Sequence, residues 1–557
     1  MNLGLDFGST YSLVSKFDDN NGGLQCFNLN MGSPYLPSVV SYDEVTQWYE
    51  YGDAAIGHIN SENKKVYTTF KTLLNPNINK IGAERDYDEK HTPEYISYIF
   101  WSKVFNKLKE KYYIDHIENV VIGIPELWGT QFCVNHGSNK KLSAAEGRKA
   151  VERIFKKFDF IDKVRIVSEP QAATAFFAYN YRKIKNCNLD GCILLIDYGG
   201  GTLDITLSDV TSLDNGKMSI KVIHSDGEGE NSGKLGSAGI LYMETLIRHA
   251  MKEKGIQDIK YNHSFLSIRQ ELEKQLRTRT DYIEMMFEQN IRHKNKLKEP
   301  LMIGEYKRSD SDNPERFEIT FLHMVDVYNQ VIYNTLDKMI DKFIPYIQRC
   351  DKPLKIGLVG GFGNYYLVQK QVNDKFNISN VNDPRVSGLF SNQEDREKAI
   401  ALGCSVIANN LVSVCETFDF AMGVYGMRDG ELFYNYGIRL RDEIEYNHVY
   451  YSKDKRGEPY TFRCHSGNLE RLLINLSDDD KDAFDMKPKR HHALENIIKS
   501  SRKAVQVGFS IDYNKIIHIH VQEVHDITKE KIGEPYDIPM DDFDNMFDPE
   551  VLIDADD

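Results

Sequence analysis

Two short apolar runs, far apart in the chain, each end in an aspartate followed by a glycine-rich turn. The first reads LGLDFGSTYSLV from Leu3, and the second reads CILLIDYGGGTLDITL from Cys192. Each apolar run is typical of a buried strand, and the glycines indicate a tight turn directly after it. Because both place an Asp at the strand end, then an aromatic residue, then Gly with Ser or Thr, we expect two related halves.

A third run of this kind, KIGLVGGFGNYYLVQ, starts at Lys355. Segments with the apolar spacing of amphipathic helices lie between the three runs. They are Pro93 to Lys111, Ser143 to Phe158, Ser264 to Thr280 and Val325 to Cys350. Strands that alternate with helices predict an α/β class.

The pattern changes after about Val414. From Phe418 to Pro539 short alternating strands and turn signals replace the long helical segments, which predicts a separate all-β sandwich. Residues 541–557 hold eight acidic residues and no Lys or Arg, so we expect a solvated acidic tail. The predicted domains are therefore 1–414, 415–540 and 541–557. Only LVSVCETFD, from Leu411, connects the first two.

Composition narrows the classes of partner. The net charge of -14 argues against nucleic acid or an anionic membrane as the main partner, and no run of 18 apolar residues could span a bilayer. The eight cysteines include no CxxC pair, which is typical of reduced thiols rather than a zinc ribbon or a disulfide framework. The chain also starts with a strand-like segment and shows no leader, so a cytoplasmic protein is expected.

The first two glycine turns have the chemistry that a nucleoside triphosphate requires. Successive backbone N–H groups without a Cβ can surround phosphate oxygens, although the chain has no GxxxxGK[ST] loop. The aspartates at the strand ends, Asp6 and Asp197, could hold a hydrated Mg²⁺ between them if both face one cleft. A single Asp-Gly turn could equally be an ordinary Asx turn.

Six motifs in order give a more specific indication. They are LGLDFGSTYSLV, GDAA at Gly52 with FKTLL at Phe70, VVIGIP at Val120, IVSEPQAATAFF at Ile166, LLIDYGGGTLDIT at Leu194 and IGLVGGFG at Ile356. In order and spacing they resemble the ATPase signatures of the heat-shock protein 70 chaperones. This resemblance implies an actin-like, two-lobed ATPase domain followed by a peptide-binding β-sandwich, which VGFSIDYNKIIHIHVQEVHDITKEK also resembles.

The resemblance implies roles for the residues of both turns. Asp6 and Asp197 would organise Mg²⁺ through water, while Ser9 and Thr202 would orient the phosphates and nearby water. The backbone that would hold the phosphates belongs to Gly8, Ser9, Thr10 and Tyr11 in the first turn and to Gly199, Gly200, Gly201 and Thr202 in the second.

The resemblance also implies two further catalytic residues. Lys71 would reach the γ-phosphate and the attacking water, and Glu169 would act on that water or on the metal shell. These roles suit phosphoryl transfer, which depends mainly on positioning and on neutralising charge. The alternatives are a solvated surface lysine for Lys71 and a charge at a helix N-terminus for Glu169.

For the adenosine, the resemblance implies Gly360 and Gly361 on one side, with Glu271 and Lys274 facing the base and ribose from the other. Glu271 and Lys274 could equally be a surface i,i+3 pair without a ligand. The chain departs from the family pattern at Asn364, where an arginine is usual.

Two local patterns invite other interpretations. Cys133 and His136 lie in an apparent insertion and have the spacing of a metal pair, but no second pair is near, so loop residues are the better interpretation. The basic run KPKRHH at 487–492 is interpreted as a solvated turn rather than a nucleic-acid patch.

The first hypothesis for function is an ATP-dependent chaperone that uses Mg-ATP binding and hydrolysis to ADP to switch the β-sandwich between loose and tight holds on extended or unfolded polypeptide. A co-chaperone or nucleotide exchange factor would be a further partner. No long helical lid follows Pro539, so we expect fast peptide release. The alternative is a scaffold or polymerising actin-fold ATPase whose β domain binds one dedicated protein. A sugar kinase is disfavoured, because that class does not combine these motifs with a β-sandwich.

Overall fold

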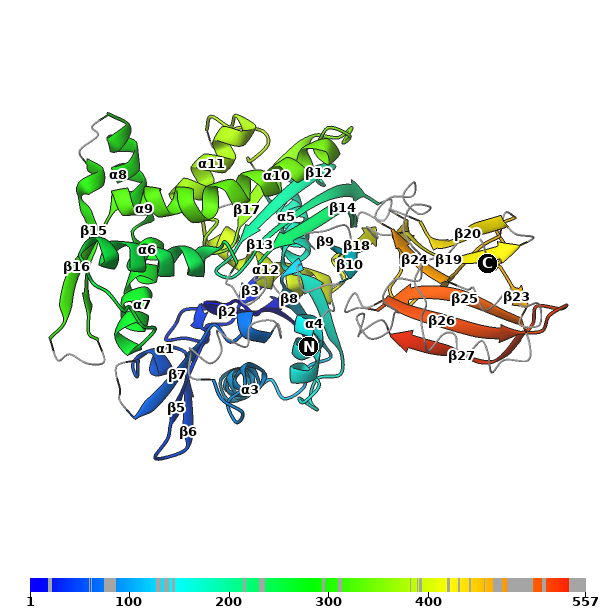
Figure 1. Ribbon diagram of the computed structural model, residues 1–557, viewed down its shortest axis with the longest axis horizontal. Coiled ribbons are helices and arrows are strands. Elements are labelled where there is room, and N and C mark those ends of the chain that lie inside the picture. Colours follow the sequence, from blue (N-terminus) through cyan, green and yellow to red (C-terminus); the bar gives the residue numbers. More distant parts are fainter. Residues whose placement is uncertain are drawn as a thin grey trace. The chain divides into compact units, whose positions relative to one another are not determined.

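A computed structural model describes most of the chain, which forms two compact units (Figure 1). The described residues are 1–18, 23–59, 61, 63–74, 87–126, 132–134, 140–142, 146–213, 217–229, 236–292, 296–308, 313–380, 382–387, 389, 393–417, 421–428, 431–439, 442–454, 456–463, 473–477, 504–512 and 517–539. The first unit comprises Met1–Leu127, Glu146–Ile220 and Ser225–Val414, and the second comprises Trp128–Ala145, Lys221–His224 and Cys415–Asp557. His136, the basic run at 487–492 and the tail at 541–557 lie outside the described residues.

The first large sheet of the first unit has the order β11-β8-β1-β2-β3. Its strands are β1 (Asn2–Asp6), β2 (Tyr11–Asp18), β3 (Gly23–Cys26), β8 (Asn119–Ile124) and β11 (Val164–Ser168), and β4 (Leu36–Pro37) pairs with β2. Strands β1, β8 and β11 are parallel, so their carboxyl ends meet at one edge of the sheet. The first glycine turn joins β1 to the antiparallel β2 at this edge.

The second large sheet repeats this arrangement. Its order begins β17-β12-β13-β14, with β12 (Gly191–Tyr198), β13 (Leu203–Ser212), β14 (Met218–Glu228) and β17 (Leu354–Val359). The second glycine turn joins β12 to the antiparallel β13, and β17 runs parallel to β12. Asp197 is therefore opposite Asp204 on one side and opposite Val359 on the other.

Two smaller sheets complete the strands of the first unit. One has the order β6-β5-β7, from β5 (Val39–Asp43), β6 (Trp48–Tyr51) and β7 (Lys64–Thr68), and the other is the hairpin of β15 (Pro300–Tyr306) and β16 (Glu315–Thr320). Short helical turns lie next to them: α1 (Asp53–Ile56), η1 (Thr72–Leu74) and η4 (Lys296–Lys298).

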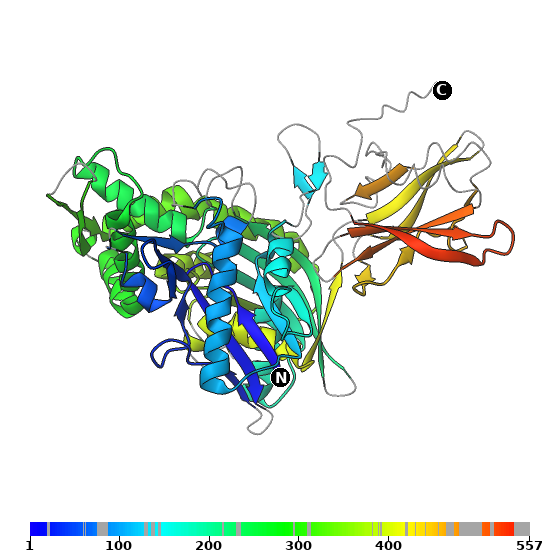
Figure 2. The same ribbon diagram turned by 90° about the horizontal axis from the view of Figure 1, so that it is seen from below.

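The mixed α/β class is confirmed, and the helices of the described residues include all four segments that the apolar spacing predicts, together with others outside those segments. The helices are α3 (Pro93–Tyr112), α4 (Glu146–Phe155), α5 (Glu169–Lys185), α6 (Gly239–Glu253), α7 (His263–Thr278), α8 (Thr280–Arg292), α9 (Phe321–Tyr328), α10 (Asn334–Ile347), α11 (Tyr366–Phe376) and α12 (Gln393–Ala408). A π-turn, η5 (Asn329–Tyr333), divides the predicted helix at 325–350. In Figure 2 the long blue helix α3 lies against the dark blue strands of the first sheet, where Trp101 meets Phe7 edge to face.

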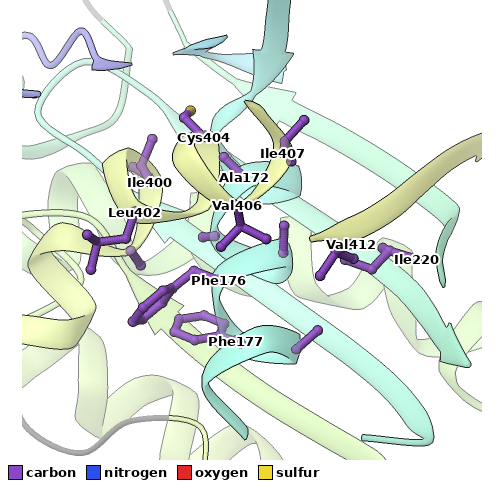
Figure 3. Packing of buried hydrophobic residues seen from close by; sticks show 14 of the residues in the cluster. Ala172, Phe176, Phe177, Ile220, Ile400, Leu402, Cys404, Val406, Ile407 and Val412 are labelled. Atoms are coloured by element: carbon purple, nitrogen blue, oxygen red, sulfur yellow. The ribbon is translucent and has the colours of Figure 1, made fainter. Parts of the chain in front are cut away.

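The helices α5 and α12 pack against each other in an apolar core that also includes residues of β8, β12 and β13 (Figure 3). Phe176 and Phe177 of α5 pack in one cluster with Val406 and Ile407 of α12, all buried. The helices approach so closely that a Cβ on Gly403 would lie 1.7 Å from the carbonyl oxygen of Ala172. This packing fixes the start of α5, which is the position of Glu169.

All the described secondary structure of the second unit consists of strands. They are β9 (Phe132–Val134), β10 (Lys140–Leu142), β19 (Ala421–Arg428), β20 (Glu431–Ile438), β21 (Glu443–Ile444), β22 (Tyr450–Tyr451), β23 (Phe462–Arg463), β24 (Leu473–Ser477), β25 (Ala504–Ile511), β26 (Ile517–Val524) and β27 (Lys531–Pro539), while β18 (Val412–Thr417) runs across the boundary at Val414. The sheets β20-β19-β24 and β22-β25-β26-β27 share one apolar core, to which Val424 and Ile438 contribute from one sheet and Val507 and Ile519 from the other. Among the described residues, no helix of the protein is both long and apolar enough to cross a membrane.

Candidate functional site

The two glycine turns face each other across one cavity of the first unit. A Cβ on Gly200 would lie 3.1 Å from the hydroxyl oxygen of Thr10, and one on Gly201 would lie 3.2 Å from that of Ser9. The following residues predicted from sequence line the cavity: Asp6, Gly8, Ser9, Thr10, Tyr11, Lys71, Glu169, Asp197, Gly199, Gly200, Gly201, Thr202, Gly360 and Gly361. Residues more than 350 positions apart in the chain thus meet at one site.

Two of these glycines are needed for the shape of the cavity wall. A Cβ on Gly8 would lie 1.9 Å from the carbonyl oxygen of Tyr11, which closes the first turn. Gly360 has a φ of 81°, and a Cβ there would lie 2.5 Å from Oδ1 of Asp197. Any larger residue would therefore collide with the backbone or with the carboxylate that the wall presents.

Lys71 and Glu169 form a buried ion pair in the cavity, through Nζ and Oε1. Lys71 follows β7 and precedes η1, while Glu169 is the first residue of α5, directly after β11. Ser168 caps this helix in a capping box with Gln171, and the N-terminus of the helix favours the negative charge of Glu169. Lys71 is only 3% exposed, so it is not the solvated surface lysine that the sequence left as an alternative.

The two aspartates are buried close to other carboxylates, which raises their pKa values. Burial raises the pKa of Asp6 to about 7, with a further increase from the charge of Glu169 and an opposing decrease from Lys71. Burial also raises the pKa of Asp197 well above its ordinary value, and the carboxylates of Glu169, Asp204 and Asp6 add to this increase. A cation between these groups would relieve their repulsion.

These residues fit a magnesium ion that keeps much of its water. Oδ2 of Asp197 is buried and has no hydrogen-bond partner among the residues that the structure describes. Carboxylate oxygens are the ligands that Mg²⁺ prefers, and Mg²⁺ usually takes only one or two of them together with waters and substrate phosphates. Within the described residues, no three His, Cys, Asp or Glu side chains come close enough to coordinate a metal together.

Helix α7 presents a different face to the cavity from the one predicted. Glu271 and Lys274 are exposed and do not line the cavity, whereas Glu273 and Arg277 do. Glu273 and Arg277 are separated by four positions, so they share a helix face that Glu271 lies away from. Instead, Glu271 accepts a hydrogen bond of 2.5 Å from the amide of Gln275.

Sequence reasoning also missed Asp204. Its side chain is fully buried directly opposite Asp197 in the β12–β13 pair, and its Oδ1 accepts a hydrogen bond of 3.0 Å from the backbone N–H of Glu126. The signal was present in GGGTLDIT, where a second Asp follows the turn. Asp204 does not line the cavity, so its effect on the site is through the charge that it places behind Asp197.

No family model matches the chain. The chain is similar to the chaperone protein DnaK of Carsonella ruddii (strain PV), with 21% identity over 94% of this chain and 81% of that protein. At this identity the similarity supports a distant relation, along most of the chain, to the heat-shock protein 70 chaperones that the six motifs resemble.

Proposed function

We propose that the first unit binds and hydrolyses ATP with Mg²⁺, and that this reaction changes how the second unit holds polypeptide. The observation that carries the proposal is the cavity in which two facing glycine turns, two aspartates and the Lys71–Glu169 ion pair converge. Glycine turns suit phosphates, carboxylates suit magnesium, and a buried lysine beside a carboxylate suits the attack of water on a phosphoryl group.

The nucleotide would lie between both glycine turns and helix α7. The backbone of 8–11 and 199–202 would bind the phosphates, and Gly360 and Gly361 would let the chain approach the adenosine closely. We assign the opposite side of the adenosine site to Glu273 and Arg277, because these α7 residues line the cavity while Glu271 and Lys274 do not. The planar guanidinium of Arg277 suits both stacking and hydrogen bonding.

The hydrolytic step would depend on Lys71 and Glu169. Glu169 would orient the attacking water and accept its proton, while Lys71 would neutralise charge that develops on the transferred phosphoryl oxygens. Bound Mg²⁺, held through water by Asp6 and Asp197, would supply further neutralisation of the phosphates. Because Lys71 and Glu169 already contact each other, they are positioned before the substrate binds.

The distant relation to a chaperone supports extended or unfolded polypeptide as the ligand of the second unit. We expect ATP and ADP to change peptide affinity by about tenfold, within the ordinary range for coupled sites. By reciprocity, peptide must change ATP affinity by the same factor. A co-chaperone or exchange factor would act on this same cycle.

The test uses the full chain and a fluorescent apolar peptide. Anisotropy titrations with ADP and then with ATP should give two peptide affinities that differ by about tenfold, and phosphate release should depend on Mg²⁺. If ATP is hydrolysed but no peptide binds in either state, the chaperone role fails. The scaffold ATPase with one dedicated partner then becomes the better account, and light scattering with ATP tests for polymers.

A further inference from the structure

Helix α7 contacts the opposite wall of the cavity through an arginine between two tyrosine rings. The Cζ atom of Arg277 lies 4.5 Å from the ring centroid of Tyr11 and 4.2 Å from that of Tyr35. Nη2 of the same arginine lies 3.8 Å from Oε2 of Glu397. All four residues line the cavity. We call this group, Tyr11, Tyr35, Arg277 and Glu397, the clasp.

Three members of the clasp belong to the wall built on the first sheet. Tyr11 begins β2 and pairs with Pro37 of β4, which places Tyr35, just before β4, beside it. The two rings meet edge to face at 6.5 Å, with their planes at 83°. Glu397 comes from α12, which packs on β1, β2 and β3 of this sheet.

Arg277 alone comes from the other side. It lies in the last turn of α7, and α7 packs on α6, α8 and β15. The first half of α7 also meets the small sheet β6-β5-β7, where Leu266 packs with Val39 of β5 and Val66 of β7. The end of α7 beside the cavity is therefore held across it by the clasp, through contacts that are cation–π and ionic rather than apolar.

We infer that Tyr35 is a positioning residue which, by holding Arg277, keeps the cavity closed over bound nucleotide and slows its release. The inference rests on the proposed function. A guanidinium between two aromatic faces and a carboxylate loses all three contacts when α7 moves away, so each contact adds to the barrier to opening. Tyr35 contributes the closer of the two rings and has no place in the proposed chemistry.

The chain offers a matched control. Cζ of Arg279 lies 4.2 Å from the ring centroid of Tyr282, the same separation as in the Arg277–Tyr35 pair. Neither Arg279 nor Tyr282 lines the cavity, and both belong to the α7–α8 side. Removal of the Tyr282 ring therefore deletes an equivalent cation–π contact that does not cross the cavity.

The experiment measures release of a fluorescent N-methylanthraniloyl ADP, loaded with Mg²⁺ onto the full chain and chased with excess ADP in a stopped-flow instrument. Tyr35→Ala should release the nucleotide about tenfold faster, as expected for loss of a partly buried cation–π contact. Tyr35→Leu keeps apolar bulk without a π face and should accelerate release to the same extent. It serves as the test in place of Tyr35→Ala if the alanine variant does not fold. Tyr35→Phe should stay within about twofold of the wild type, because its ring is kept, and so should Tyr282→Ala.

The outcomes separate this inference from the proposed function. Unchanged release from Tyr35→Leu would overturn the inference about Tyr35 while leaving nucleotide binding intact. Tighter nucleotide binding by this variant would also overturn it, because the nucleotide would then normally displace Arg277 from the clasp. Equal acceleration by Tyr35→Phe or by Tyr282→Ala would also overturn it, because the effect would then not come from the ring on Arg277. A wild-type protein that binds no Mg-ADP would overturn both proposals.

Discussion

The two glycine turns have nearly the same sequence pattern, but the charges around their aspartates differ. Asp6 has Glu169 as its main repulsive neighbour, and its pKa rises to about 7. Asp197 has Glu169, Asp204 and Asp6 around it, and one of its oxygens has no hydrogen-bond partner in the described part of the chain. A repeated local motif therefore becomes two unequal halves of one site, and the aspartate of the second turn has more carboxylate neighbours that repel its negative charge.

The largest expected effect is that of Asp197→Asn, which should lower Mg-dependent ATP turnover on the order of 10³-fold. The same change should raise the melting temperature of the nucleotide-free protein, because it removes a carboxylate from a cluster of four. Phosphate release and thermal unfolding measure the two effects. Asp6→Asn, as the matched variant in the first turn, should show the smaller gain in melting temperature. Equal gains would mean that the turns are equivalent after all.

Lys71→Ala should lower turnover on the order of 10²-fold while ATP affinity changes little, because its proposed role is at the attacking water. It also leaves Glu169 buried without its lysine, which should destabilise the fold by about 3–5 kcal/mol. Chemical denaturation and single-turnover hydrolysis measure these losses.

The double variant Lys71→Met with Glu169→Gln is the control, since it removes both charges of the pair. Its stability should recover while its turnover should not. If turnover recovered with stability, the ion pair would serve only the fold.

Protonation of Asp6 should make the site depend on pH. The pKa of Asp6 is about 7 in the folded protein against an ordinary value of 3.8, so the folded state binds the proton more tightly. The contribution of Asp6 to stability without ligand should therefore fall as pH rises from about 4 through 7. Mg-ADP must displace this proton, so its affinity should be about tenfold weaker at pH 6 than at pH 8. Calorimetry at both pH values checks this, and Asp6→Asn should reduce the dependence to the part that the raised pKa of Asp197 contributes.

The smallest expected effects distinguish the two faces of α7. Glu273→Gln should weaken nucleotide binding about fivefold, as expected for a hydrogen bond to a charged group, while Glu271→Gln should leave it unchanged. Calorimetric titration of both variants with Mg-ADP is the measurement. A larger effect at Glu271 would restore the assignment made from sequence.

The central part of the site could be predicted because its residues lie inside local patterns. Asp6 and Asp197 end apolar strands and glycines follow both, so the local pattern predicts where the chain reverses direction. Glu169 follows the same logic, because Ser168 and Gln171 form the capping box that starts its helix.

The rest depends on tertiary structure that no local pattern contains. RQELEKQLRT predicts a helix, but which face of α7 meets the cavity is decided by its packing on α6 and β15. Glu271 and Glu273 are only two positions apart, and each has a basic residue three or four positions further along the helix, Lys274 or Arg277. The sequence therefore does not distinguish between the two faces. Tyr35 lies in a loop without a motif, and only the pairing of β2 with β4 brings it to Tyr11 and Arg277.

The most direct test of the central claim is a single-turnover assay, with the protein in excess over ATP labelled on the γ-phosphate and with Mg²⁺ either present or chelated. We expect the wild-type protein to convert the bound ATP to ADP and phosphate only with Mg²⁺, and Asp197→Asn to leave it as ATP under both conditions. Hydrolysis by the wild type and Asp197→Asn at the same rate, or wild-type protein that binds Mg-ATP without hydrolysing it, would contradict the account.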